Sequence, residues 1–399
     1  MRAAGDGNME QKKTKQKNWP TILFMVLTAG GLIAVLLLGQ AHGLDILWIG
    51  AGYIVTMSVT LLLQLILHEF GHLLGGLASG YVFVFFRILN IQIMGQNGKL
   101  IRKKFHIVGT GGQCLMAPPK PYDPDFPYKL YNLAGGFFNL LMAGIALFLI
   151  ILLSLNGHPG SLWILFLVPL FTAGVYCGAT NLIPMFVGGI ANDGWNVAHL
   201  GKDPEARRIL WFMLDVMAFI SQGGRFRDLP EEWFELGGDI DFTDYYRCAL
   251  AVYRFNYLED GGRLSEACEL AGEILAEGEN IPQIYRYELA CERIFLELIG
   301  EGGPIPSSDQ EQRHATVLAR VTALYTPELQ HYIKATATYP QRQRLNYALA
   351  KLYTGDEAAG QTALKKFVKA CKTYPNSGEI QSEWELIGLV DCALAQEAL

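Results

Sequence analysis

The 399-residue sequence predicts an all-α membrane core of four transmembrane helices with a small β-hairpin insertion, followed by a soluble α-helical-hairpin domain. Three observations predict this class: long apolar stretches without charge, one segment rich in aromatic and β-branched residues, and an acidic second half with helical periodicity. Residues 1–199 carry 12 Lys and Arg against 7 Asp and Glu, whereas residues 200–399 carry 20 against 31. We therefore expect a basic N-terminus with a first anchor (1–45), a membrane core (46–199) and a cytoplasmic helical-hairpin domain (200–399).

The membrane spans are predicted from length, because a helix needs about 20 apolar residues to cross a bilayer. The charge-free stretches are residues 18–44, 46–67 and 130–192. The turn-forming residues Asn156–Gly160 divide the third stretch into spans near 133–155 and 162–183. The first span is too long for a signal-peptide core, so we expect it to remain as an anchor.

The orientation follows from the Lys and Arg residues of the short connections. Five precede the first span and seven lie between the second and third spans, whereas the other two connections carry none. The charges predict a multi-pass protein of the cell membrane with both termini in the cytoplasm.

The connection between the second and third spans has the composition of a β-hairpin. Residues 81–94 are rich in aromatic and β-branched side chains, and Gly95–Gly98 contains an Asn-Gly pair that leads into residues 100–108. The glycine-rich segment 109–113 is expected to be a flexible connection.

The second span ends in a motif with metal-binding spacing. His68 and His72 are four residues apart, so both imidazoles lie on one helix face and reach one Zn²⁺ at about 2.0 to 2.1 Å. Glu69 is placed to act on the attacking water rather than to bind the metal. A solvated surface does not explain the motif, because an ionisable residue within a span costs about 2.5 to 3.5 kcal/mol.

A hydrolytic zinc site also needs a third protein ligand and one open position. Asp193 is the candidate, because it is the only carboxylate in residues 126–202 and follows the fourth span. The Gly188–Gly189 pair interrupts the helix before it, and irregular backbone is tolerated at membrane depth where it lines a cavity. The alternatives are that Asp193 merely begins the cytoplasmic tail, or that His106 or His199 supplies the third ligand.

Three motifs occur in order on three spans: His68-Glu69-Phe70-Gly71-His72, Leu133-Ala134-Gly135-Gly136-Phe137-Phe138-Asn139, and Asn181-Leu182-Ile183-Pro184 followed by Asp193-Gly194. Together they resemble the motifs of the site-2 protease family of intramembrane zinc metalloproteases, over about residues 46–194. The resemblance implies that Asn139 contacts the scissile carbonyl region. It also favours a hairpin that binds an extended substrate strand along its edge, over a hairpin that only rests on the membrane.

The sequence departs from the family pattern at three places. Gly136 stands where the family has proline, and Asn192 stands where it often has leucine. Asp193 follows Asn181 by twelve residues, whereas the family spacing is eight, so the register of the third ligand differs by about one helical turn.

The second half predicts paired helices without catalytic residues. Segments 244–259 and 263–278 form one expected helical hairpin, and glycine pairs separate further segments. Residues 348–353 repeat the pattern of residues 249–253 at a distance of 99, close to three tetratricopeptide periods of 34 residues. We expect a tetratricopeptide-like stack that offers a surface to a cytoplasmic protein partner.

These observations predict a zinc metalloendopeptidase that hydrolyses a peptide bond of a membrane-embedded protein or peptide. Zn²⁺ is bound by His68, His72 and Asp193, and the catalytic residues are Glu69 and Asn139. The alternative is a non-catalytic membrane-anchored scaffold that binds partners through its helical domain. The intact Glu69 favours the enzyme, because a structural zinc site does not require it. A pI of 5.8 and the lack of a basic cluster in the soluble half exclude nucleic acid as a partner.

Overall fold

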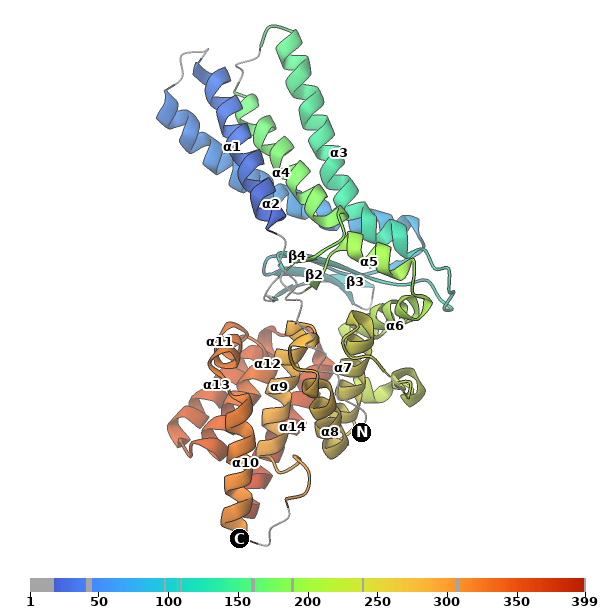
Figure 1. Cartoon of the computed structure of the whole chain (residues 1–399), viewed down its shortest axis with the longest axis vertical. Helices are drawn as coiled ribbons and strands as arrows, with labels where there is room; N and C mark the ends of the chain where they lie inside the picture. Colours follow the sequence, from blue (N-terminus) through green and yellow to red (C-terminus); the bar gives the residue numbers. More distant parts are fainter. Residues whose placement is uncertain are drawn as a thin grey trace, which may run out of the picture. The chain divides into compact units, whose positions relative to one another are not determined.

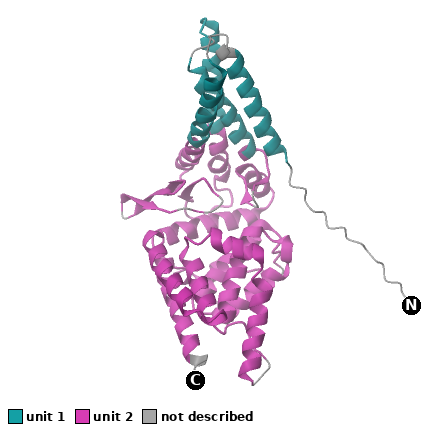
Figure 2. Cartoon of the chain, turned by 90° about the vertical axis from the view of Figure 1, so that its left-hand side faces the viewer, with its two compact units in different colours: residues 1–64, 139–180 teal, residues 65–138, 181–399 magenta. Residues whose placement is uncertain are grey.

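The computed structural model describes residues 18–40, 45–96, 98–105, 107, 110–158, 162–187, 190–238, 240–305 and 309–397. The chain divides into two compact units, each built from two separate stretches (Figure 2). Unit 1 contains residues 1–64 and 139–180, and unit 2 contains residues 65–138 and 181–399.

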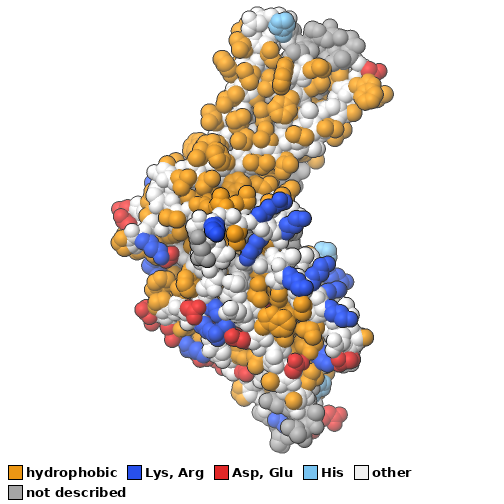
Figure 3. Space-filling view, turned by 180° about the vertical axis from the view of Figure 1, so that it is seen from behind, with side chains coloured by type: hydrophobic (Ala, Val, Ile, Leu, Met, Phe, Trp, Pro, Cys, Tyr) orange, Lys and Arg blue, Asp and Glu red, His pale blue; other side chains and the backbone are white. Residues whose placement is uncertain are grey.

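Four helices of the described chain are long and apolar enough to cross a membrane, which confirms the predicted number. They are α1 (Trp19–Gln40), α2 (Ile46–Ala78), α3 (Tyr128–Leu155) and α4 (Ile164–Leu182) (Figure 1). Their outer surfaces are hydrophobic (Figure 3), with Leu47, Trp48 and Leu155 each 80 to 81% exposed. An apolar surface of this extent is typical of helices that contact lipid.

Helix α2 is longer than the span predicted from its charge-free stretch. It continues without interruption from Ile46 through the His68–His72 motif to Ala78, which gives 33 residues. At 1.5 Å per residue this helix is about 50 Å long, against a hydrocarbon core of about 30 Å. The His68–His72 motif therefore lies near the C-terminal end of α2, after the apolar stretch.

The predicted orientation can be tested with an impermeant thiol reagent on intact cells. Gly157 and Gly300 are both exposed, and the charge distribution places position 157 outside and position 300 inside. We expect labelling of a cysteine introduced at 157 in intact cells, and labelling at 300 only after permeabilisation. The exposed Cys392 of the unmodified chain is the control and should behave like position 300. Labelling at 300 in intact cells would overturn the orientation.

Unit 1 is held together by close packing among α1, α2 and α4. Tyr53 of α2 is 2% exposed, and its hydroxyl donates to the Thr28 carbonyl of α1 at 2.9 Å. A Cβ at Gly31 would lie 2.5 Å from the Tyr53 oxygen, so this glycine permits the approach. Val35, Ile49 and Val168 complete the apolar contact.

The segment between α2 and α3 forms a four-stranded antiparallel sheet rather than the predicted two-stranded hairpin. Its strands are β1 (Val82–Ile88), β2 (Ile91–Gln96), β3 (Lys99–Lys104) and β4 (Gly112–Ala117), in the order β3-β2-β1-β4. The expected single strand over 81–94 is broken at Leu89, which has a φ of 52°. The predicted flexible connection was also wrong at its end, because residues 112 and 113 begin β4 and pair with Ile88 and Arg87.

The chain after α4 forms a short hairpin before it reaches the C-terminal helices. Strands β5 (Phe186–Val187) and β6 (Ile190–Ala191) pair as an antiparallel hairpin. The helix α5 (Asp193–Leu200) follows, and then α6 (Pro204–Ser221), which packs on the sheet through Ala218 against Val84, Met94 and Leu115. The predicted bend at Gly188–Gly189 falls on residues outside those described.

The remaining chain consists of consecutive helices around one apolar core. They are α7 (Tyr245–Asp260), α8 (Leu264–Ala276), α9 (Gln283–Leu298), α10 (Gln310–Leu324), α11 (Pro327–Ala335), α12 (Pro340–Ala348), α13 (Glu357–Thr373) and α14 (Ser377–Glu397). The expected hairpin over 244–259 and 263–278 corresponds to α7 and α8. Phe255, Ala267, Phe295 and Phe367 are each at most 1% exposed in this core.

The sheet also contacts the helices of the C-terminal region within unit 2. The Lys103 ammonium donates to the Pro375 carbonyl at 2.7 Å, and the Gln222 amide donates to the Gly95 carbonyl at 2.8 Å. Phe105 packs edge-on against Tyr374, with ring centroids 5.1 Å apart. These contacts attach the sheet to the helices of the C-terminal region.

Candidate metal centre

The two histidines of α2 point their imidazoles at one place. Because they are one helical turn apart, His68 and His72 lie on the same face of α2. Their Nε2 atoms are 3.0 Å apart. The side chains are 12% and 11% exposed, so both imidazoles are largely withdrawn from solvent.

Asp193, the first residue of α5, brings a carboxylate to the same place. Its Oδ2 atom lies 3.3 Å from His68 Nε2 and 3.4 Å from His72 Nε2. Two donor atoms that bind one zinc ion tetrahedrally at about 2.0 to 2.1 Å are about 3.3 Å apart. The three predicted ligands are therefore brought together at separations that suit one ion.

The position of Asp193 depends on Asn192, whose role was not predicted from the sequence. The Asn192 amide donates to the Ile183 carbonyl at 2.7 Å, and its oxygen accepts from the Met185 amide at 3.1 Å. The same oxygen accepts from the Trp195 amide at 2.8 Å and so caps α5. Asn192 thereby closes the β5–β6 hairpin and starts the helix whose first residue is Asp193.

The orientation of His72 is fixed by backbone of α3. Its Nδ1 lies 2.7 Å from the Tyr131 carbonyl oxygen, which can only accept a hydrogen bond. The proton is therefore on Nδ1, and Nε2 offers its lone pair to the site in the neutral ring. Contacts of this kind set the tautomer of metal-binding histidines.

Helices α2 and α3 approach closely where the histidines lie, because small residues face one another. A Cβ at Gly71 would lie 2.6 Å from the Ala134 carbonyl oxygen, and one at Gly75 would lie 2.5 Å from the Ala134 Cβ. A Cβ at Gly135 would lie 2.6 Å from His72 Nε2 and 2.7 Å from His68 Cε1. Gly135 thus leaves the space that the imidazoles use.

We expect Gly135→Ala to weaken zinc binding by about 10- to 100-fold, the range seen when groups that orient metal ligands are disturbed. The added methyl group would displace both imidazoles. Zinc content after dialysis against a zinc buffer measures the effect. Gly144→Ala on the same helix is the control, because nothing lies within 4 Å of its added Cβ. Equal zinc content in the two variants would show that Gly135 does not shape the site.

Glu69 is buried against the sheet. It is 6% exposed, and a Cβ at Gly112 would lie 2.7 Å from its Oε1 atom. Arg87, which is fully buried, donates to the carbonyls of Leu89 at 3.0 Å and Gly112 at 3.4 Å. Glu69 interacts electrostatically with both imidazoles, with Asp193 and with Arg87. Burial lowers the pKa of Arg87, and the Glu69 carboxylate opposes this shift. The sheet thereby limits the space around Glu69.

The donor set fits a zinc ion. Oδ2 of Asp193 is buried and accepts no hydrogen bond from the described residues, although both imidazoles lie within ion-pair distance. Burial alone would raise the pKa of the Asp193 carboxyl, but the charge of His72 and the contacts with both imidazoles hold it well below its usual range. Two imidazoles and one carboxylate are typical ligands of an open, catalytic zinc site.

Asn139 lies in unit 1, and its side-chain amide forms hydrogen bonds to another residue of the same unit. Its Nδ2 donates to the Gln64 backbone carbonyl and to Gln64 Oε1, both at 2.8 Å, and the residue is fully buried. Gln64 in turn donates to the Leu170 carbonyl at 3.3 Å. Asn139 thus links α3 to α2, and its contact with a substrate stays a prediction.

His106 and His199 were the alternative candidates for the third ligand. His106 lies outside the described residues. His199 belongs to a second group, with Asp203 and Asp244, and its Nε2 is 3.5 Å from Asp244. The guanidinium of Arg247 already forms ion pairs with both carboxylates of that group, at 2.8 and 3.1 Å. The first group is therefore the better candidate for a metal ion.

Comparisons of the chain with family models, with curated proteins and with solved structures find no match.

Proposed function

We propose that the chain is a zinc-dependent intramembrane endopeptidase of the site-2 protease type. The observation that carries the proposal is the meeting of His68, His72 and Asp193, with the buried Glu69 beside them on a membrane-length helix. Ionisable groups on such a helix are costly and are usually retained for function. A structural site would not need the adjacent carboxylate.

In this proposal His68, His72 and Asp193 hold the ion and leave one position open. When bound, zinc lowers the pKa of water to about 7 and polarises a carbonyl group. The Glu69 carboxylate accepts the proton of the attacking water as the water oxygen bonds to the scissile carbonyl carbon. Glu69 then gives this proton to the amide nitrogen as the carbon–nitrogen bond breaks. The products are one carboxylate and one amine.

The sheet supports the proposal because a protease must hold its substrate as an extended chain. A substrate helix has its carbonyls bonded internally, and strand addition to a sheet edge supplies substitute hydrogen bonds. The described sheet has two edges, β3 and β4. Gly112 at the start of β4 packs on Glu69, so the β4 edge is the one next to the proposed base.

The proposed setting is the cell membrane with both termini in the cytoplasm, as the charge distribution predicts. The helices after α6 then form a cytoplasmic tetratricopeptide-like stack. Such stacks use one face to bind other proteins, and this face would select substrates or partners.

The test is a mass-spectrometric comparison of membrane peptides from cells with the active chain and with the Glu69→Gln chain. Peptides that end within apolar segments should appear only with the active chain. Chelation of zinc should remove the same peptides. Identical peptide profiles would favour the scaffold alternative, in which the metal site has no hydrolytic role.

A further inference from the structure

A cavity of about 300 Å³ lies among the helices of the C-terminal region. It is bounded by α7, α9, the start of α12 and α14. Six carboxylates line it: Glu259, Asp260, Glu288, Glu292, Glu379 and Glu383. Only two arginines, Arg225 and Arg342, share the lining. The walls therefore carry more negative than positive groups.

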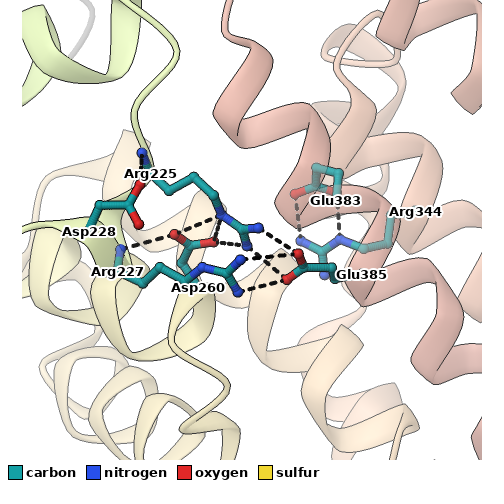
Figure 4. A network of polar contacts seen from close by, with 7 residues as sticks. All are labelled: Arg225, Arg227, Asp228, Asp260, Arg344, Glu383 and Glu385. Atoms are coloured by element: carbon teal, nitrogen blue, oxygen red, sulfur yellow. Dashed lines mark hydrogen bonds and ion pairs between the residues drawn. The ribbon is translucent and has the colours of Figure 1, made fainter.

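Four of the six carboxylates accept hydrogen bonds from arginine. Asp260 is 2.5 Å from Arg225, and Glu383 is 2.7 Å from Arg344, which lies behind the wall (Figure 4). Glu292 is 2.6 Å from Arg344, and Glu288 pairs with Arg342. The Asp260 pair links α7 to the segment before Phe226, and the other three pairs join α9, α12 and α14. Both lining arginines, Arg225 and Arg342, are therefore already paired.

The other two carboxylates have no directly hydrogen-bonded cation among the described residues. Glu379 accepts from neutral groups, the Tyr374 hydroxyl at 2.5 Å and the Asn376 amide at 3.1 Å. Oε1 of Glu259 is buried and accepts no hydrogen bond from the described residues, and its ion pair with Arg344 is long, at 3.8 Å. The Glu259 side chain is only 11% exposed. Burying a carboxylate in this way is costly unless a charge partner is supplied.

The pKa values of both groups reflect this cost. Burial, and then the neighbouring Glu292 carboxylate, raise the pKa of Glu259 well above its usual range. Burial also raises the pKa of Glu379. A cation bound in the cavity would lower both pKa values and stabilise the charged forms.

Aromatic side chains complete the cavity. Phe226, Phe255, Tyr285, Tyr339 and Tyr374 line it together with the carboxylates. Aromatic faces attract guanidinium and ammonium groups, more strongly when these are withdrawn from water. A cavity of about 300 Å³ is at the lower end for ligand sites and suits one or two side chains.

We propose that this cavity binds an arginine or lysine side chain from the cytoplasmic flank of a membrane-protein substrate, with Glu259 and Glu379 as its partners. The source of the cation rests on the proposed protease function and orientation. Membrane proteins concentrate Lys and Arg in the short segments on the cytoplasmic side of their spans. A substrate held at the metal centre would therefore offer basic side chains to a cytoplasmic acidic cavity.

The experiment measures binding of a short fluorescent peptide with one arginine to the purified full-length protein in detergent. A peptide with neutral citrulline in place of arginine is the ligand control. We expect the arginine peptide to bind about tenfold or more tightly than the citrulline peptide. Glu379→Gln and Glu259→Gln should each remove most of this difference, and neither should lower the melting temperature, because each relieves a buried charge. Glu273→Gln, exposed on α8, should leave binding unchanged.

The outcomes separate the two proposals. Equal binding of both peptides, or full binding by both cavity variants, would overturn the cavity site. Free arginine that competes at the same concentration as the peptide would overturn its assignment to a peptide side chain. If one variant fails to fold, the other decides the result. Binding should persist in Glu69→Gln, so arginine-dependent binding without any proteolysis would remove only the protease proposal.

Discussion

The Glu69→Gln chain is expected to bind about one zinc ion but to lose peptide-bond hydrolysis by about 10²- to 10⁴-fold or more. The amide keeps the shape of the side chain and leaves His68, His72 and Asp193 in place. It cannot accept the proton of the attacking water, and general base catalysis is typically worth 10² to 10⁴ in rate. Release of a labelled product from a membrane-embedded peptide, with zinc content measured in the same sample, tests this result.

The matched control for this substitution is Glu277→Gln, which makes the same change on an exposed side chain at the C-terminal end of α8. It should keep both zinc and turnover. Retained cleavage by the Glu69→Gln chain would exclude the proposed mechanism. Loss of zinc in that chain would instead assign Glu69 to the metal ligands.

The Asp193→Ala chain is expected to lose both zinc and turnover, with zinc affinity lower by more than about 100-fold. Disturbing groups that only orient ligands already costs about 10- to 100-fold. This substitution removes a ligand, and also the negative charge that lies 3.3 Å and 3.4 Å from the two imidazoles. Zinc titration with a competing chelator measures the loss.

The alternative ligands supply the controls for Asp193. His199→Ala should keep zinc and turnover, because His199 lies in the second group with Asp203 and Asp244. His106→Ala should behave in the same way. A chain that keeps zinc after Asp193→Ala but loses it after either histidine change would show that the third ligand was assigned wrongly.

The membrane helices could be predicted from the sequence because their signal is local. Charge-free stretches of sufficient length define four helices, and the Asn156–Gly160 turn separates the last two. The ends were less certain, because nothing in the composition stops α2 at Leu67. The helix continues to Ala78 since no proline or charge repulsion interrupts it. The predicted motif therefore lies within a regular helix.

The sheet was only partly predicted, because two of its strands depend on contacts that are distant in the sequence. The turn predicted at the Asn-Gly pair falls between β2 and β3, where Gly98 has a φ of 71°, and Asn97 lies outside the described residues. The break at Leu89 requires a positive φ, and this conformation is not expected at a leucine. The strand β4 begins at Gly112, the last residue of a glycine-rich stretch, and is stabilised by pairing with β1, so the start of the strand resembles a loop in sequence.

The candidate metal ligands were predicted by their chemistry, whereas the groups that position them were not. Residue type and spacing single out His68 and His72, and the lack of other carboxylates singles out Asp193. The acceptor for His72 is the Tyr131 carbonyl, and a backbone group has no sequence signature. In the sequence, Asn192 is only a departure from the family pattern. Its role depends on hydrogen bonds to the backbone of residues 183 and 185, which the sequence does not reveal.

Because of the β5–β6 hairpin, the number of residues between α4 and Asp193 can change without a change in the distance between α4 and the Asp193 carboxylate. Because Asn192 bonds back to residues 183 and 185, the backbone leaves and re-enters at the same point. Residues added in pairs at the far end of the hairpin lengthen the loop without moving the carboxylate, and such insertions cost little. The hairpin can therefore accept insertions while the three side chains stay together. The number of residues before the aspartate does not decide whether a chain can form this site.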